Sequence, residues 1–185
     1  KQMKIPNFLD TLIKKAAHSL KFFRTPAGNL AIFNGSKQET KFLIDKILNQ
    51  ADGKARGRGP ISLSQSGYEK LVCQGITVFV DTHYNNKKKS SKAPHAIEVY
   101  IGKTRMVGSC GTIYKKDKKW KDSLLSASAH SSLIIENTNA YYCDEPINLT
   151  SNKRYQKNGS EIVFLRHDGY RKKFSATCFR TIEVS

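Results

Sequence analysis

The first candidate for chemistry in this chain is a histidine that precedes an apolar run. His130 lies in Ala129-His130-Ser131-Ser132, directly before Leu133–Ile135, which we predict to be a buried strand. A neutral imidazole at such a place can bind a metal or transfer a proton. The alternative is a histidine that hydrogen-bonds a neighbouring loop at a simple turn. Both interpretations stay open on these residues alone.

The segment His167-Asp168-Gly169-Tyr170 is a second candidate for proton chemistry. A carboxylate beside an imidazole can tune the imidazole pKa, and the Tyr170 phenol can take part in proton transfer. Asp-Gly between two β-type runs is also a common hairpin signal. We favour the hairpin, with a turn between predicted strands at Glu161–Arg166 and Tyr170–Ser175.

Basic and aromatic residues alternate in two stretches, one around Trp120 and one from Tyr170 to Phe174. An exposed Trp among lysines can stack on a sugar or a base while ammonium groups hold sulfate, carboxylate or phosphate. Alternatively, Trp120 packs its loop onto the protein and the lysines point to water. The candidate ligand-binding residues are Lys103, Arg105, Lys119, Trp120, His130, Tyr170 and Lys172.

The charge of the chain restricts its partners. Its 185 residues include 32 Lys and Arg against 15 Asp and Glu, a formal net charge of +17. Such a surface attracts polyanions, whether nucleic acid, anionic polysaccharide or anionic membrane. A generally lysine-rich composition explains the charge equally well. No apolar run approaches the roughly 20 residues of a membrane span, and no C-x-x-C pattern supports a zinc ribbon or redox motif.

Two helices and a series of short strands must position these residues. Helical spacing predicts one helix from Asn7 or Asp10 to about Lys21, and a second over Lys37–Gln50 that is capped by Ser36. From Ile61 onward, short β-type runs separated by turn signals predict an antiparallel sandwich or barrel. These runs are Gly67–Cys73, Ile76–Thr82, Ala96–Ile101, Thr104–Ser109, Ser132–Glu136, Glu161–Arg166, Tyr170–Ser175 and Cys178–Val184.

The order of several motifs resembles the C-terminal β-sandwich of heparinase II/III-like proteins, in particular the branch common in alphaproteobacteria. The motifs are Glu98-x-x-x-Gly102-x-x-Arg105, the Cys110-Gly111-Thr112 corner, a Trp-containing loop and the segment Ala129–Asn139. The resemblance implies a mainly β protein in three parts. Residues 1–51 would be a helical segment from the end of an α/α toroid, 52–60 a Gly- and Arg-rich linker, and 61–185 an antiparallel β-sandwich.

The resemblance also implies where a metal would lie. His130 matches a histidine that belongs to a metal site in the family lyases, but Lys89, Ser91 and Ser109 stand where the other ligands are expected. His95 is a weak substitute. One imidazole without a second histidine or a carboxylate does not make a zinc site. We therefore expect no metal and no other cofactor, and we favour the structural interpretation of His130.

The activity implied by the resemblance is β-elimination on an acidic polysaccharide that carries uronic acid or sulfate. In the family the base and acid come mainly from the toroid, so we expect this chain to be inactive alone, with His130 a weak catalytic candidate. The expected partners are acidic polysaccharide and the rest of the toroid, not a membrane. The family implies a periplasmic or extracellular location, although the chain shows no signal peptide. A non-catalytic polyanion- or glycan-binding module is the alternative, and nucleic-acid binding through positive charge is a third interpretation.

Overall fold

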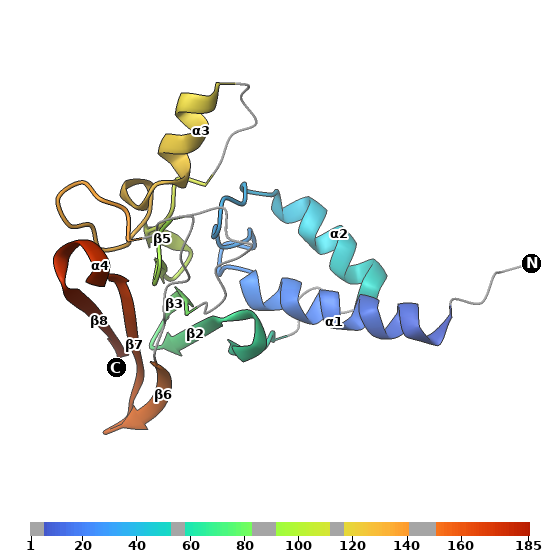
Figure 1. Ribbon diagram of the computed structural model, residues 1–185. Helices are drawn as coiled ribbons and strands as arrows, with labels where there is room; N and C mark the ends of the chain where they lie inside the picture. The colour runs from blue at the N-terminus through green and yellow to red at the C-terminus, as the bar shows by residue number, and fades with distance from the viewer. Residues whose placement is uncertain (1–5, 53–57, 83–91, 112–116, 141–150) are drawn as a thin grey trace, which may run out of the picture.

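The computed structural model describes residues 6–52, 58–82, 92–111, 117–140 and 151–185. Two helices, α1 (Asn7–Phe23) and α2 (Lys41–Asp52), lie side by side on the opposite side of the molecule from the C-terminal strands (Figure 1). They pack through Ala17, Ile44 and Leu48. No helix in the described ranges is long and apolar enough to cross a membrane.

The start of α2 differs from the prediction. The hydroxyl of Thr40 accepts a hydrogen bond from the Leu43 N–H at 3.4 Å, and α2 begins at Lys41. The Ser36 hydroxyl instead accepts from the Phe33 N–H at 3.1 Å, so Ser36 closes a turn and does not cap the helix. The predicted start at Lys37 is therefore wrong, because Ser36 satisfies a nearer backbone group.

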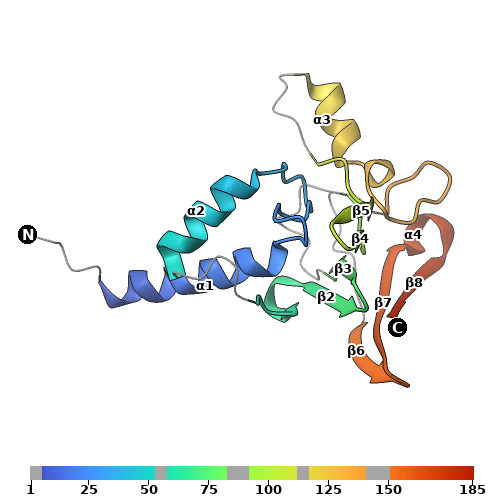
Figure 2. The ribbon, with the colours of Figure 1, turned by 180° about the vertical axis from the view of Figure 1, so that it is seen from behind.

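The strands form two antiparallel sheets, which confirms the predicted sandwich. The first sheet has the order β1 (Ser62–Leu63), β2 (Tyr68–Cys73), β3 (Ile76–Asp81), β4 (Ile97–Ile101), β5 (Thr104–Val107). The second has the order β6 (Ser151–Lys157), β7 (Ser160–Tyr170), β8 (Ala176–Val184), seen on the side of Figure 2 that carries the C-terminus. Aliphatic residues of both sheets meet between them: Leu71, Val78, Val80, Val163, Leu165 and Val184.

The helical segment covers the other face of the first sheet. Phe22 at the end of α1 meets Phe79 of β3 edge to face, with ring centroids 6.0 Å apart, and both side chains are completely buried. Phe23 contacts Tyr68 in the same way at 4.9 Å. Strand β3 in the middle of the first sheet is thus buried on both faces, which explains why it reads as a nearly continuous apolar run.

Part of the predicted linker 52–60 is packed against the helices. Asp52 is the last residue of α2. A side chain at Gly59 would place its Cβ 2.5 Å from the carbonyl oxygen of Lys21, so residue 59 touches the last turn of α1. Residues 53–57 of the predicted linker lie outside the described part of the chain.

The predicted turn at Asp168-Gly169 and the predicted strand Tyr170–Ser175 are wrong. Strand β7 continues through Tyr170 with an irregularity after His167, and the chain reverses at the short helix α4 (Arg171–Phe174). Tyr170 is 1 % exposed, and a Cβ at Gly169 would lie 2.3 Å from the Ala140 carbonyl oxygen. Burial of the strand therefore outweighs the local turn signal.

Two further differences lie in the middle of the chain. The predicted buried strand Ser132–Glu136 is wrong, since Leu133 is 48 % exposed and a tight turn follows, with an isolated bridge between Ile135 and Thr138. The predicted Trp-containing loop holds a helix, α3 (Lys118–Leu125), whose first turn is capped by the Asp117 carboxylate. Strand β6 was not predicted.

Replacing Phe22 by alanine tests whether the helices and the sandwich share one core. We expect Phe22→Ala to lower the free energy of unfolding by about 3–4 kcal/mol, because it leaves a cavity against Phe79. Phe42→Ala on α2, where Phe42 is 78 % exposed, should change it by less than about 0.5 kcal/mol. Urea denaturation followed by circular dichroism measures both. An unchanged main transition in Phe22→Ala would mean that the sandwich does not depend on the helical segment.

Candidate functional site

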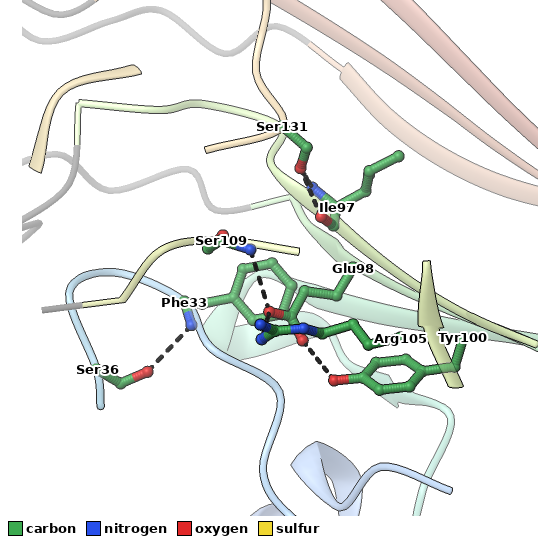
Figure 3. Close-up of polar contacts among 8 residues, drawn as sticks. All are labelled: Phe33, Ser36, Ile97, Glu98, Tyr100, Arg105, Ser109 and Ser131. Atoms are coloured by element: carbon green, nitrogen blue, oxygen red, sulfur yellow. Dashed lines mark hydrogen bonds and ion pairs between the residues drawn. The ribbon is translucent and has the colours of Figure 1, made fainter. Parts of the chain in front are cut away.

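A fully buried carboxylate lies where the first sheet meets the helical segment (Figure 3). Glu98 on β4 accepts a hydrogen bond from the Tyr100 hydroxyl at 2.8 Å and one from the Ser109 N–H at 3.3 Å. The backbone of Ile32 hydrogen-bonds to it as well. The guanidinium of Arg105 lies 3.6 Å from the carboxylate. One side chain thus connects β4, β5, the corner after β5 and the segment after α1.

The hairpin of β4 and β5 places the side chains of Glu98 and Arg105 on the same face of the sheet. Gly102 has φ +53° between the paired residues Ile101 and Thr104, which confirms the predicted two-residue turn at Gly102-Lys103. A Cβ at Gly108 would lie 2.9 Å from Arg105 Cδ, so the absence of a side chain lets Arg105 lie across the strand. The spacing Glu98-x-x-x-Gly102-x-x-Arg105 therefore encodes an ion pair across a hairpin.

The electrostatics of this cluster suit a structural role. Burial raises the pKa of Glu98, and hydrogen bonds from Tyr100, Ser109 and Ile32 together with the Arg105 charge oppose that rise. Burial and the Glu98 charge raise the pKa of Tyr100. The phenol consequently keeps its proton and donates it in a hydrogen bond.

His130 follows a short 3₁₀ helix, η3 (Ala127–Ala129), and is buried next to the corner after β5. The Cys110 N–H donates to the Ala129 carbonyl at 3.0 Å. Within the described residues, His130 Nε2 and the Ser109 hydroxyl oxygen are buried without a hydrogen-bond partner. Burial lowers the pKa of His130, while a hydrogen bond to the Leu124 backbone and the charge of Asp81 oppose this effect. The imidazole is therefore neutral near pH 7.

The His167 segment faces inward. His167 is 2 % exposed, its Nδ1 accepts from the Gly169 N–H at 3.2 Å, and its ring lies edge to face with that of His95 at a centroid distance of 4.9 Å. Burial lowers the pKa of His167 to about 4. The Tyr170 hydroxyl donates to the carbonyls of Leu133 at 2.7 Å and Thr138 at 3.1 Å. These groups hold the turn after His130 against the second sheet.

Comparison with known proteins decides the family. The sequence profile described as heparinase II/III-like, C-terminal matches residues 55–185. The chain belongs to the heparinase II/III-like family. Among curated protein sequences, none matches it significantly.

Solved structures share the fold of this heparinase II/III-like chain. A heparinase III is 15 % identical, with a TM-score of 0.70 over 97 % of this chain and 33 % of that chain. A mutant heparan sulfate lyase from Pedobacter heparinus is 14 % identical, with a TM-score of 0.73 over 97 % and 31 %. At these identities the similarity establishes the fold alone. The chain spans about a third of the length of these proteins.

The residues present do not fit the metal site that the heparinase II/III-like resemblance implies. In the described ranges, no group of three His, Cys, Asp or Glu side chains is arranged to hold a metal ion. His130 Nε2 and the Ser109 hydroxyl oxygen are buried polar atoms without a hydrogen-bond partner. One imidazole and one hydroxyl are a poor set of ligands for a divalent metal ion. His95 contacts His167. Lys89 and Ser91 lie outside the described residues, so the expected absence of a metal stays a prediction.

The residues predicted to bind substrate lie at several separate places on this heparinase II/III-like fold. Trp120, 56 % exposed, and Lys119 lie on α3, which projects from the body of the molecule (Figure 1) and whose Leu124 contacts His130. Tyr170 is buried, so its phenol is not presented to a ligand. The remaining three residues lie elsewhere. Arg105 forms an ion pair with Glu98, Lys103 lies in the β4–β5 turn, and Lys172 lies on α4.

A cationic pocket that the sequence patterns did not indicate lies between the helical segment and the first sheet. Its volume is about 720 Å³, and its lining includes Lys21, Arg24, Lys41, Arg58, Lys70 and Lys103. Apart from Lys21 and Arg24 at the end of α1, these side chains come from separate elements, so no local spacing links the whole set. Only Lys103 was a candidate, as part of the hairpin turn.

The Glu98–Arg105 pair can be tested by a double-mutant cycle. Arg105→Ala leaves the carboxylate with neutral donors only and should lower the free energy of unfolding by about 2 kcal/mol. In a Glu98→Gln background, Arg105→Ala should cost about 1 kcal/mol less, since Arg105 is partly exposed and its ion pair is partly screened. Urea denaturation of the four proteins gives the coupling. Equal costs in both backgrounds would mean that the two side chains act independently.

The lowered pKa of His167 should make the stability of the fold sensitive to acid. Its pKa is about 4 when folded and about 6.5 in an unfolded chain, so the unfolded state takes up the proton first as pH falls. Stability linked to His167 is fully present above pH 6.5 and is lost down to pH 4, amounting to about 2 kcal/mol between pH 7.5 and pH 5. Urea denaturation at both pH values should show a smaller difference for His167→Asn than for the exposed control His18→Gln. The same pH difference in both variants would exclude this origin.

Proposed function

We propose that this chain is the C-terminal part of a polysaccharide lyase that cleaves acidic polysaccharide by β-elimination. The observation that carries the proposal is the match of the heparinase II/III-like C-terminal family to residues 55–185. The solved neighbours are named heparinase III and heparan sulfate lyase. A substrate bearing uronic acid or sulfate also suits the net charge of +17. Export to the periplasm or the cell exterior is part of the same proposal.

The chemistry needs groups that three tyrosines of this chain, each at least partly buried, do not offer in suitable form. β-Elimination requires a base for the proton beside the uronate carboxylate, an acid for the leaving oxygen and a group that neutralises the carboxylate. Burial raises the pKa of Tyr68, Tyr100 and Tyr170, which makes these phenols poor bases. We therefore assign binding and positioning of the polysaccharide to this chain, and catalysis to the remainder of the longer protein.

A non-catalytic glycan-binding module is the second candidate. Trp120 favours it, because this exposed ring lies among Lys118, Lys119 and Lys121 on α3, and an aromatic face beside ammonium groups can hold a charged sugar. The two candidates differ in whether the complete protein changes the polysaccharide or only binds it.

Product analysis tests the proposal. The complete protein that contains this chain, and this chain alone, are each incubated with heparan sulfate and with alginate. We expect the complete protein to generate unsaturated uronate, followed by its ultraviolet absorbance, and the chain alone to generate none. New reducing ends without unsaturated uronate would identify a hydrolase and overturn the proposal. Binding without cleavage by the complete protein would instead favour the glycan-binding module.

A further inference from the structure

The pocket between the helical segment and the first sheet carries only positive charges in its lining. Six of its fourteen lining residues are Lys or Arg and none is acidic, and the remainder are small, hydroxyl-bearing or aliphatic residues. Just outside the lining, Asp45 forms an ion pair with Arg24. The pocket volume of about 720 Å³ lies in the range of small-ligand sites.

Several contacts fix the segments that carry the cations. A Cβ at Gly28 would lie 2.8 Å from Lys41 Cδ, so the aliphatic part of Lys41 rests on the Gly28 backbone. The close approach of Gly59 to the Lys21 carbonyl holds the neighbouring Arg58 beside α1. Lys103 stands in the two-residue turn of the β4–β5 hairpin. The charged groups thus reach one pocket from elements whose backbones are already fixed, which reduces the entropy lost on binding.

Lys70 is the observation that points most directly to a ligand. It lines the pocket, is 8 % exposed, and its ammonium donates to the Phe22 carbonyl at 2.7 Å between the rings of Phe22 and Phe79. No carboxylate in the described part of the chain forms an ion pair with it, and burial lowers its pKa to about 8. A buried cation without a counter-charge is destabilising, and the negative charge of an anion in the adjoining pocket would lower this cost.

From this geometry we propose that the pocket binds an acidic segment of the polysaccharide chain through its sulfate or carboxylate groups. The proposal rests on the proposed function for the identity of the ligand. The lining supports this ligand over single-stranded nucleic acid, because it contains no aromatic side chain on which a base could stack. The site is separate from α3, so Trp120 and the neighbouring lysines are not part of it.

Two charge-matched triple variants test the pocket. Lys41→Gln/Arg58→Gln/Lys103→Gln removes three exposed cations of the lining and leaves the buried Lys70 intact. Lys118→Gln/Lys119→Gln/Lys121→Gln removes three exposed lysines of α3. Both lower the formal net charge from +17 to +14, since 17 − 3 = 14. Thermal unfolding verifies that both variants remain folded.

Binding of a heparin hexasaccharide, an alginate hexamer and oligothymidylate is measured by calorimetry over a series of salt concentrations. We expect the pocket variant to bind at least one of the two glycans about tenfold more weakly than the wild-type chain, and the α3 variant to stay within about threefold. A charge-conserving variant, Lys41→Arg/Arg58→Lys/Lys103→Arg, should recover most of the affinity.

Three results would overturn the assignment of ligand binding to the pocket. The first is an equal loss of glycan affinity in both glutamine variants, which would mean that the attraction is generic. The others are a larger loss of glycan affinity in the α3 variant and preferential binding of oligothymidylate. The product assay separates the two proposals. If the complete protein forms unsaturated uronate while its pocket variant keeps the same KM, the pocket assignment fails and the lyase assignment stands. If neither glycan is bound or cleaved, both proposals fail.

Discussion

The buried carboxylate of Glu98 is the contact on which the arrangement of the other elements depends. A carboxylate in apolar surroundings is tolerated when donors satisfy its oxygens. Here the donors belong to Tyr100 in the same strand, Ser109 in the corner and Ile32 in the segment after α1, with Arg105 of β5 beside them. Displacing any of these parts would leave a buried charge incompletely satisfied. A polar contact therefore fixes the helical segment to the sandwich in addition to the apolar packing.

Different side chains bury the two faces of the first sheet at its central strands. Aliphatic side chains fill the space toward the second sheet, whereas aromatic rings, Phe22 and Phe79 among them, fill the space toward the helices. The aromatic side admits a cation, because ring faces and a helix-end carbonyl stabilise the ammonium of Lys70. The cationic pocket thus forms when the helices pack against the sheet.

Two arginines of this heparinase II/III-like chain connect elements that are distant in the sequence. Arg154 of β6 bonds Glu69 of β2 and Glu161 of β7, each at 2.9 Å, and so connects the two sheets. Arg24 is held by Asp45 in the same way. A planar guanidinium suits such pairs, because its fixed N–H donors match the geometry of a carboxylate.

The sequence by itself determined the sandwich, the β4–β5 turn at Gly102-Lys103 and the order of motifs that marks the family, since period-two runs and turn residues are local signals. Local signals failed at Asp168-Gly169, where burial of His167 and Tyr170 carries the strand through a predicted turn. Tertiary structure also decided which candidates face a ligand, and it joined cations distant in sequence into one pocket. Side chains from separate segments meet only when the helices dock on the sheet, and no local pattern encodes that contact.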